Sequence, residues 1–197
     1  MCSNKFPFSL YFFLLILFSC EQVKTGVIAI KIPRQVPRKY YPVRDQAFSK
    51  VQDTLFYKGL RFSGYVFAIN ENQDTSIVMG FLNGLQEGTT RKWYPNKKLL
   101  EERFYIQGGK EGTHRGWWEN GRPKFTYHFV NDEFEGPLTE WFSNGKLYRQ
   151  FHYKNGHECG SEKMWWDNGT IRANYVIING EKFGLFGQKL CTNKNFK

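Results

Sequence analysis

The stretch GPLTEWFSNGKLYRQFHYKNGHEC, residues 136–159, is one complete unit of the tandem repeat that decides the fold. Its first glycine recurs every 24 residues, with no insertion or deletion. Five residues after four of these glycines comes a tryptophan, and three residues later an asparagine. The glycines are Gly64, Gly88, Gly112, Gly136, Gly160 and Gly184, and the tryptophans are Trp93, Trp117, Trp141 and Trp165. Such a period predicts an array of similar units, each contacting its neighbours.

Each unit has the pattern of a β-hairpin. Two runs of strand-forming residues flank Ser143-Asn144-Gly145, and Asn155-Gly156 ends the second run. Asn-Gly is a strong hairpin signal, because both residues tolerate the positive φ of a type I′ turn. Equivalent pairs recur at Asn120-Gly121, Asn168-Gly169 and Asn179-Gly180. No segment has a sustained helical period, so the sequence predicts an all-β fold: an elongated antiparallel β-meander in one twisted sheet.

Alternation along a strand assigns the aromatic residues to two faces. The repeat tryptophans share one face, and the residue that follows each of them points to the other. This second set is Tyr94, Trp118, Phe142 and Trp166. Corresponding strands of neighbouring units are expected about 9.6 Å apart. The rings can therefore form ladders in place of a compact core.

These landmarks resemble the MORN repeat, in the variant found in YwqK-family antitoxins. Gly59-Leu60-Arg61-Phe62-Ser63-Gly64 looks like the opening motif of that family. The glycine, tryptophan and Asn-Gly positions match in 83–96, 112–121, 136–145 and 155–169, and the resemblance covers about residues 57–190. It implies a hairpin-repeat scaffold and specifies little about activity. Ile69 and Lys189 stand at the tryptophan phase, as expected of atypical terminal units.

The N-terminus has the pattern of an export signal. Lys5 precedes an apolar stretch that runs from Phe6 to Phe18. The sequence Leu17-Phe18-Ser19-Cys20 resembles a bacterial lipobox, although Phe18 is bulkier than the usual residue. The resemblance implies that Cys20 is lipidated and anchors the mature chain to a membrane without spanning it. Because Glu21 follows the cysteine, the outer membrane of a Gram-negative bacterium is the expected location, with ordinary secretion or a retained anchor as alternatives.

The chain is thus expected to have four parts. They are the signal peptide (1–19), a linker or cap (20–56), the repeats (57–190) and a tail (191–197). Val27–Ile32 could form one strand, and Ala47–Tyr57 one short helix or strand. The prolines between residues 33 and 42 favour an extended tether over a basic spacer that binds anionic lipid.

The two cysteines of the mature chain beyond Cys20 are predicted to be free thiols. Cys159 falls at one end of a strand and Cys191 at the phase of the opposite turn. Cys159 stands one residue before a repeat glycine, and Cys191 stands seven residues after the next one. Seven residues of strand span about 23 Å, whereas a disulfide tolerates about 7 Å between Cα atoms.

No residue pattern in the chain predicts catalysis or a metal site. His128 and His152 share a repeat phase and are expected about 9.6 Å apart, too far to bind one zinc ion together. Asp132, Glu133 and Glu135 lie in a predicted turn without an opposed partner group. No cofactor is expected. The net charge of +10 is spread along the chain and is interpreted as solvated sheet faces, without a nucleic-acid partner.

The leading hypothesis is a non-enzymatic, lipid-anchored scaffold that binds another protein in the cell envelope. Trp118, Phe142, Trp166 and Tyr94 are the candidate contact residues, although a purely structural role for both aromatic sets is the simpler interpretation. The alternatives are a polysaccharide-binding module that uses the same rings, and an antitoxin, as the family resemblance implies.

Overall fold

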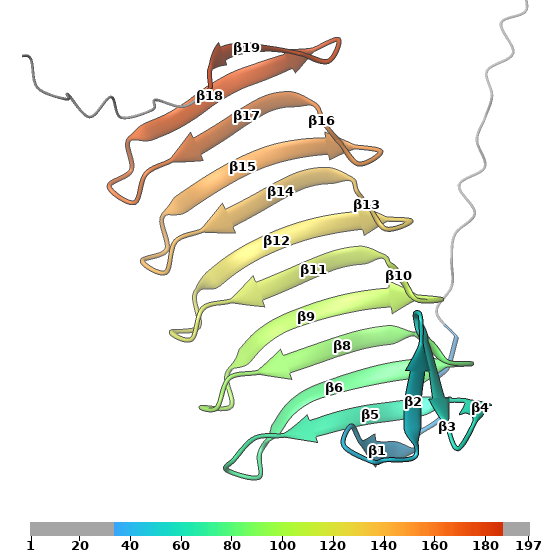
Figure 1. The fold of residues 1–197 in the computed structure, drawn as a ribbon. Helices are drawn as coiled ribbons and strands as arrows, with labels where there is room; N and C mark the ends of the chain where they lie inside the picture. Colours follow the sequence, from blue (N-terminus) through green and yellow to red (C-terminus); the bar gives the residue numbers. More distant parts are fainter. Residues whose placement is uncertain (1–33, 187–197) are drawn as a thin grey trace, which may run out of the picture. The chain divides into compact units, whose positions relative to one another are not determined.

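The computed structural model describes residues 34–186. Within this range the regular structure is β, and no helix that could span a membrane occurs. Most strands lie side by side in one large, open sheet, seen from β5 to β18 in Figure 1. A separate small sheet consists of β2 (Phe48–Val51), β3 (Thr54–Tyr57) and β4 (Leu60–Arg61). The prediction of an all-β meander of hairpins is confirmed.

The large sheet follows the chain order and is antiparallel except at its first pair, β1 with β5. Its long strands are β1 (Tyr40–Pro42), β5 (Gly64–Ile69), β6 (Thr75–Leu82), β8 (Gly88–Trp93), β9 (Leu99–Ile106), β11 (Gly112–Trp117), β12 (Pro123–Val130), β14 (Gly136–Trp141), β15 (Leu147–Lys154), β17 (Gly160–Trp165), β18 (Ile171–Ile178) and β19 (Glu181–Leu185). Four two-residue strands each pair back onto the long strand before them: β7 (Leu85–Gln86), β10 (Gly109–Lys110), β13 (Glu133–Phe134) and β16 (His157–Glu158).

The spacing of the glycines has a backbone cause. Gly88, Gly112, Gly136 and Gly160 are the first residues of β8, β11, β14 and β17, and their φ angles lie between 66° and 75°. The chain must change direction there as it leaves a two-residue strand. A side chain would be strained in this conformation, whereas glycine adopts it readily.

The two ends of a unit use different turns, and the sequence predicted only one of them correctly. Asn155 (φ 49°) and Gly156 (φ 75°) are both left-handed, as a type I′ turn requires. After the tryptophans, only the glycine of each Asn-Gly pair has positive φ. The type I′ prediction is therefore wrong for Asn120-Gly121, Asn144-Gly145 and Asn168-Gly169.

The asparagine closes that second turn with its side chain. Asn120 Oδ1 accepts a hydrogen bond from Arg122 N (3.0 Å), and Gly121 N donates to Trp118 O (2.7 Å). Asn96, Asn144 and Asn168 make the same bond to the amide two residues on. Asn120 Nδ2 also donates to Ser143 O in the next unit (2.8 Å). The repeated asparagine thus both closes its own turn and joins neighbouring turns.

A ladder of glutamates joins the opposite ends of the units, and sequence reasoning missed it. In three units, the glutamate before the repeat glycine accepts a hydrogen bond from the first residue of the next type I′ turn. The bonds run from Gln107 N to Glu87 Oε2 (2.9 Å), Asn131 N to Glu111 Oε2 (3.1 Å) and Asn155 N to Glu135 Oε2 (2.8 Å). The signal was present in the sequence, since these glutamates recur every 24 residues. Cys159 takes the same position in the next unit as a half-buried free thiol, whereas Cys191 lies outside the described residues.

One face of the large sheet carries a buried column with one residue per unit. The column is Val66, Thr90, His114, Leu138 and Glu162, each at most 3% exposed. We call this side of the sheet the packed face and the other side the outer face. The two-residue strands help to cover the packed face. Phe134 on β13 packs against Phe129 (centroids 4.5 Å apart) and Tyr153 (5.1 Å) of β12 and β15.

The small sheet packs with the first unit through aromatic rings. Phe62 contacts Phe48 (centroids 5.1 Å apart), Tyr41 (5.4 Å) and Phe81 (6.3 Å). Ala47–Tyr57, which the sequence left open, thus contains the two strands β2 and β3. Because Tyr57 and Leu60–Arg61 belong to the small sheet, the hairpin series begins at Gly64. Val27–Ile32 lies outside the described residues.

In two units, the large and the small residue of one cross-strand pair on the packed face are exchanged. Gly116 pairs with Phe125, and a Cβ at position 116 would overlap the Phe125 ring. Two units on, Met164 pairs with Ala173. We expect Gly116→Met to lower the free energy of unfolding by about 2–3 kcal/mol, because it overpacks this site.

Adding Phe125→Ala should restore most of that loss by recreating the Met164–Ala173 pair. Urea denaturation of the single and double variants measures the coupling between the two sites. Strictly additive losses would contradict this account of the packing.

Candidate functional site

The second aromatic of each unit is held at a β-bulge. The register shifts between Gly116 and Trp117, so that Trp117 pairs with Pro123 and Lys124 is left as the extra residue of β12. Lys124 Nζ lies 4.5 Å from the centre of the Trp118 ring. In the next two units Tyr148 packs on Phe142 (5.0 Å), and Arg172 lies over Trp166 (4.6 Å). These three bulges therefore each place one side chain against the candidate aromatic of their own unit.

Two of the candidate aromatics are also joined to the next unit. Tyr94 Oη donates to Trp117 O (3.0 Å), and Trp118 Nε1 donates to Trp141 O (3.0 Å). A buried polar end that finds a partner fixes the ring orientation. These rings therefore have a structural role, in addition to any role in binding a ligand.

Trp118 and Phe142 meet in one hollow of about 280 Å³, which we call the aromatic hollow. Its walls are Trp118, Lys124, Phe125, Tyr127, Glu140, Trp141, Phe142 and Tyr148. Tyr94 and Trp166 belong to the neighbouring units and do not line it. Sequence reasoning missed Lys124 and Tyr148, although both follow an Asn-Gly pair at the same spacing. Because Phe125, Tyr127 and Glu140 belong to the packed face, the hollow opens on that side of the sheet.

One wall of the hollow is a fixed polar cluster. Tyr127 Oη donates to Glu140 Oε1, and Arg149 donates to both carboxylate oxygens of Glu140 (2.7 and 2.8 Å). Burial, followed by the bond to Glu140, raises the pKa of Tyr127 above its usual value. The tyrosine therefore keeps its proton at neutral pH, and Glu140 is already occupied by its partners. The cluster orients the wall and leaves no general base for catalysis.

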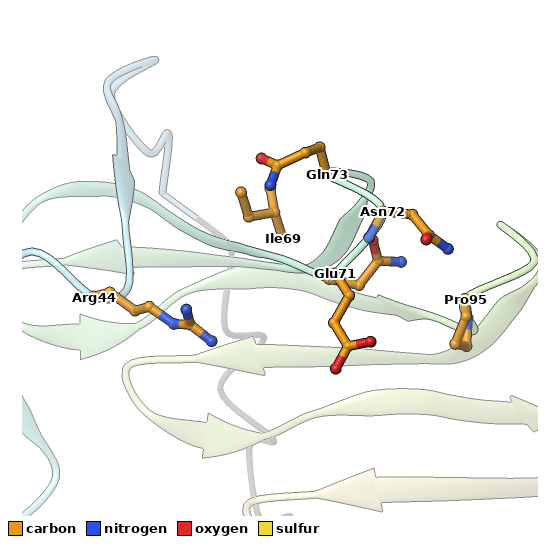
Figure 2. Close-up of a pocket in the computed structure, with 7 residues that line it drawn as sticks. Arg44, Ile69, Glu71, Asn72, Gln73 and Pro95 are labelled. Carbon is orange, nitrogen blue, oxygen red and sulfur yellow. The ribbon is translucent and has the colours of Figure 1, made fainter.

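A further hollow of about 540 Å³ lies at the turn between β5 and β6. Ile69 and Asn70 stand there at the phases of the tryptophan and the second aromatic, so smaller side chains leave space beside Pro95. Figure 2 shows Arg44 and Pro95 on either side of the turn that carries Glu71. Asn70 Oδ1 accepts bonds from Asn72 N and Asp74 N (both 3.0 Å). We interpret this hollow as the space left where the aromatic ladder ends, because the first unit lacks the two aromatic residues.

Three of the four histidines are ladder or core residues, and the fourth, His157, is exposed on β16. His128 contacts Thr113 Oγ1 (3.3 Å), and His152 Nδ1 donates to Ser161 O (3.0 Å). His114 is fully buried, and its Nε2 donates to Phe104 O (2.9 Å). Burial lowers the pKa of His114 and keeps the ring neutral. Residues 34–186 contain no group of three His, Cys, Asp or Glu side chains that could hold a metal ion.

The acidic residues of the β12–β13 turn have structural partners. Glu135 belongs to the glutamate ladder, and Asp132 Oδ1 accepts a bond from Lys110 N (2.8 Å). Their bonds tie neighbouring turns together. They form no acid–base pair.

Comparison with known families agrees with this geometry. Residues 86–107 and 134–155 match the MORN repeat variant. These are MORN-type repeats. Both matches run from a two-residue strand, through a hairpin, to the next type I′ turn, two units apart. No curated protein matches the chain. The array is thus a MORN-repeat scaffold, a type of protein that typically has no catalytic activity.

Glu162 in the buried column makes stability depend on pH. Its two oxygens share one donor, the His152 amide (3.1 and 3.2 Å), and burial raises the pKa of Glu162 from 4.5 to about 7. The unfolded chain loses this proton at a lower pH than the folded one. Raising the pH from about 4.5 to 7 therefore favours unfolding, and the effect is complete above pH 7.

We expect Glu162→Gln to remove this dependence. Relative to the wild type, the variant should gain about 3 kcal/mol of unfolding free energy between pH 4 and pH 8. Denaturation curves at both pH values measure the change. Glu162→Leu introduces the residue that Leu138 provides at the same phase, and it should show the same pH-dependent gain in stability. A stability difference between variant and wild type that is equal at pH 4 and pH 8 would contradict the assignment of this pKa to Glu162.

Proposed function

We propose that the array is a non-enzymatic scaffold that holds a protein partner through the aromatic hollow. The observation that carries the proposal is the meeting of Trp118, Phe142 and Tyr148 in one cavity on the packed face of the sheet. Binding energy at protein interfaces concentrates where aromatic residues surround a pocket that an apolar anchor can fill. A cavity of about 280 Å³ fits one large side chain of a partner.

The walls of the hollow favour a partner with an apolar anchor and polar groups around it. Trp118 and Phe142 are fixed by Trp141 O and Tyr148, and Glu140 is fixed by Arg149. Fixed walls reduce the conformational entropy lost on binding. Lys124 adds a positive charge at the rim, which suits a carboxylate on the partner.

The proposal places the scaffold in the cell envelope, anchored by lipid at Cys20. The support is the lipobox resemblance around Cys20, in a segment outside the described residues. Lipid anchoring would hold the array at a membrane surface, with the outer membrane as the proposed site. The antitoxin role that the YwqK resemblance implies is less compatible with export, because an intracellular toxin would lie across a membrane.

A photo-reactive amino acid in place of Tyr148 tests the hollow directly in membranes of the native cell. We expect one dominant crosslinked protein, and Trp118→Ala with Phe142→Ala should reduce the crosslink at least about tenfold by removing the anchor pocket. Thr139→Ala, on the outer face of β14, is the matched control and should leave the crosslink unchanged. Capture that survives the loss of both rings in folded protein would refute the site.

Mass spectrometry of the protein purified from the same membranes reports whether Cys20 is acylated. Acyl masses on Cys20 would support the anchor. An unmodified Cys20 in soluble protein would contradict the anchor and favour the antitoxin role instead.

A further inference from the structure

A third hollow, of about 440 Å³, opens on the outer face at the first two units. Its walls are Tyr40, Tyr65, Val78, Thr89, Arg91 and Trp93. None of them lines the aromatic hollow, and the two sites are on opposite faces of the sheet. We call this third hollow the tyrosine platform.

The platform depends on the parallel strand at the sheet edge. β1 pairs with β5 in a register that places Tyr40 beside Tyr65. The two rings stack with centroids 5.0 Å apart and planes 14° apart, forming one nearly continuous aromatic surface. Tyr40 remains 58% exposed, so its ring is accessible to a ligand. Trp93 lines the same hollow and is the first member of the tryptophan ladder.

A donor and an acceptor lie beside these rings. Arg91 Nε donates to Glu102 Oε2 (2.7 Å) from the neighbouring strand, and the Arg91 side chain is half exposed. The pair has little net charge, and the bond uses only one of the five N–H donors of a guanidinium. The hydroxyl of Thr89 is a further polar group in the wall.

We propose that the tyrosine platform binds a neutral pyranose oligosaccharide. A pyranose ring has one face of C–H groups, which packs on a flat aromatic surface, and a rim of hydroxyls that both donate and accept. Arg91, Glu102 and Thr89 match that rim, while Tyr40, Tyr65 and Trp93 match the face. The volume lies in the range of small-molecule sites. A nucleic acid fits less well, because the single arginine here is already neutralised by Glu102.

The neighbouring unit suggests how a longer glycan would continue. Thr113, Arg115 and Trp117 repeat the phase of Thr89, Arg91 and Trp93, two strands further on. That step is about 9.6 Å. A linear oligosaccharide lying across the strands would therefore meet the same residue types again.

Titration of the full-length protein with tetrasaccharides tests this site. The probes are the tetramer of N-acetylglucosamine, cellotetraose and maltotetraose, read by calorimetry and tryptophan fluorescence. We expect at least one to bind, and Tyr40→Ala to weaken its affinity about tenfold, similar to the loss of one aromatic stacking partner. Tyr40→Phe, which keeps the ring, should retain binding, and Arg91→Gln should weaken it.

Two control variants separate this site from the rest of the array. Lys163→Gln changes the same column of the outer face three units away from the hollow, and Trp118→Ala changes the aromatic hollow on the packed face, so both should bind the saccharide as the wild type does. No binding of any probe, equal binding by the folded Tyr40→Ala and Arg91→Gln proteins, or binding of single-stranded DNA alone would overturn the proposal. Because Trp118→Ala tests the partner site separately, failure of either proposal leaves the other standing.

Discussion

The structure depends on how each unit returns to the next one at its type I′ end. A left-handed glycine turns the chain into the next strand, and the glutamate before it accepts the first amide of the following turn. Glu111 and Glu135 do this at 3.1 and 2.8 Å. Hydrogen bonds with a charged partner contribute more to stability than neutral ones. The repeat length is therefore fixed, because an inserted residue would misplace both the glycine and the carboxylate.

This constraint leaves the two faces free to differ from unit to unit. The buried column changes from valine to threonine, histidine, leucine and glutamate, while the backbone path stays the same. Such variation allows the aromatic hollow to form between Trp118 and Phe142. The tyrosine platform arises in the same way at the first unit, where β1 adds Tyr40 to the outer face. In this account the fold supplies a regular frame, and local substitutions create the sites.

The sequence predicted the frame because the frame is set by local chemistry. Glycine at the positive φ of Gly136, and Asn-Gly at Asn155, are short-range signals that a single chain reveals. The turn at Asn120 was assigned wrongly, because the same dipeptide serves two turns and only the contact with Arg122 distinguishes them. The bulges that place Lys124 and Tyr148 in the aromatic hollow depend on pairing between strands, which residue alternation does not show. Tyr40 was unpredictable for a similar reason, since the parallel pairing of β1 joins residues 25 positions apart.

Amide hydrogen exchange measured by NMR tests the glutamate ladder most directly. If the carboxylates hold the turns, the amides of Gln107, Asn131 and Asn155 exchange slowly, whereas the Asn179 amide, which follows Cys159 at the same phase, exchanges faster. In Glu111→Ala the protection of Asn131 should fall by about tenfold, matching the loss of a hydrogen bond of about 1.4 kcal/mol, while Asn155 remains protected. Unchanged protection of Asn131 in that variant would contradict the account.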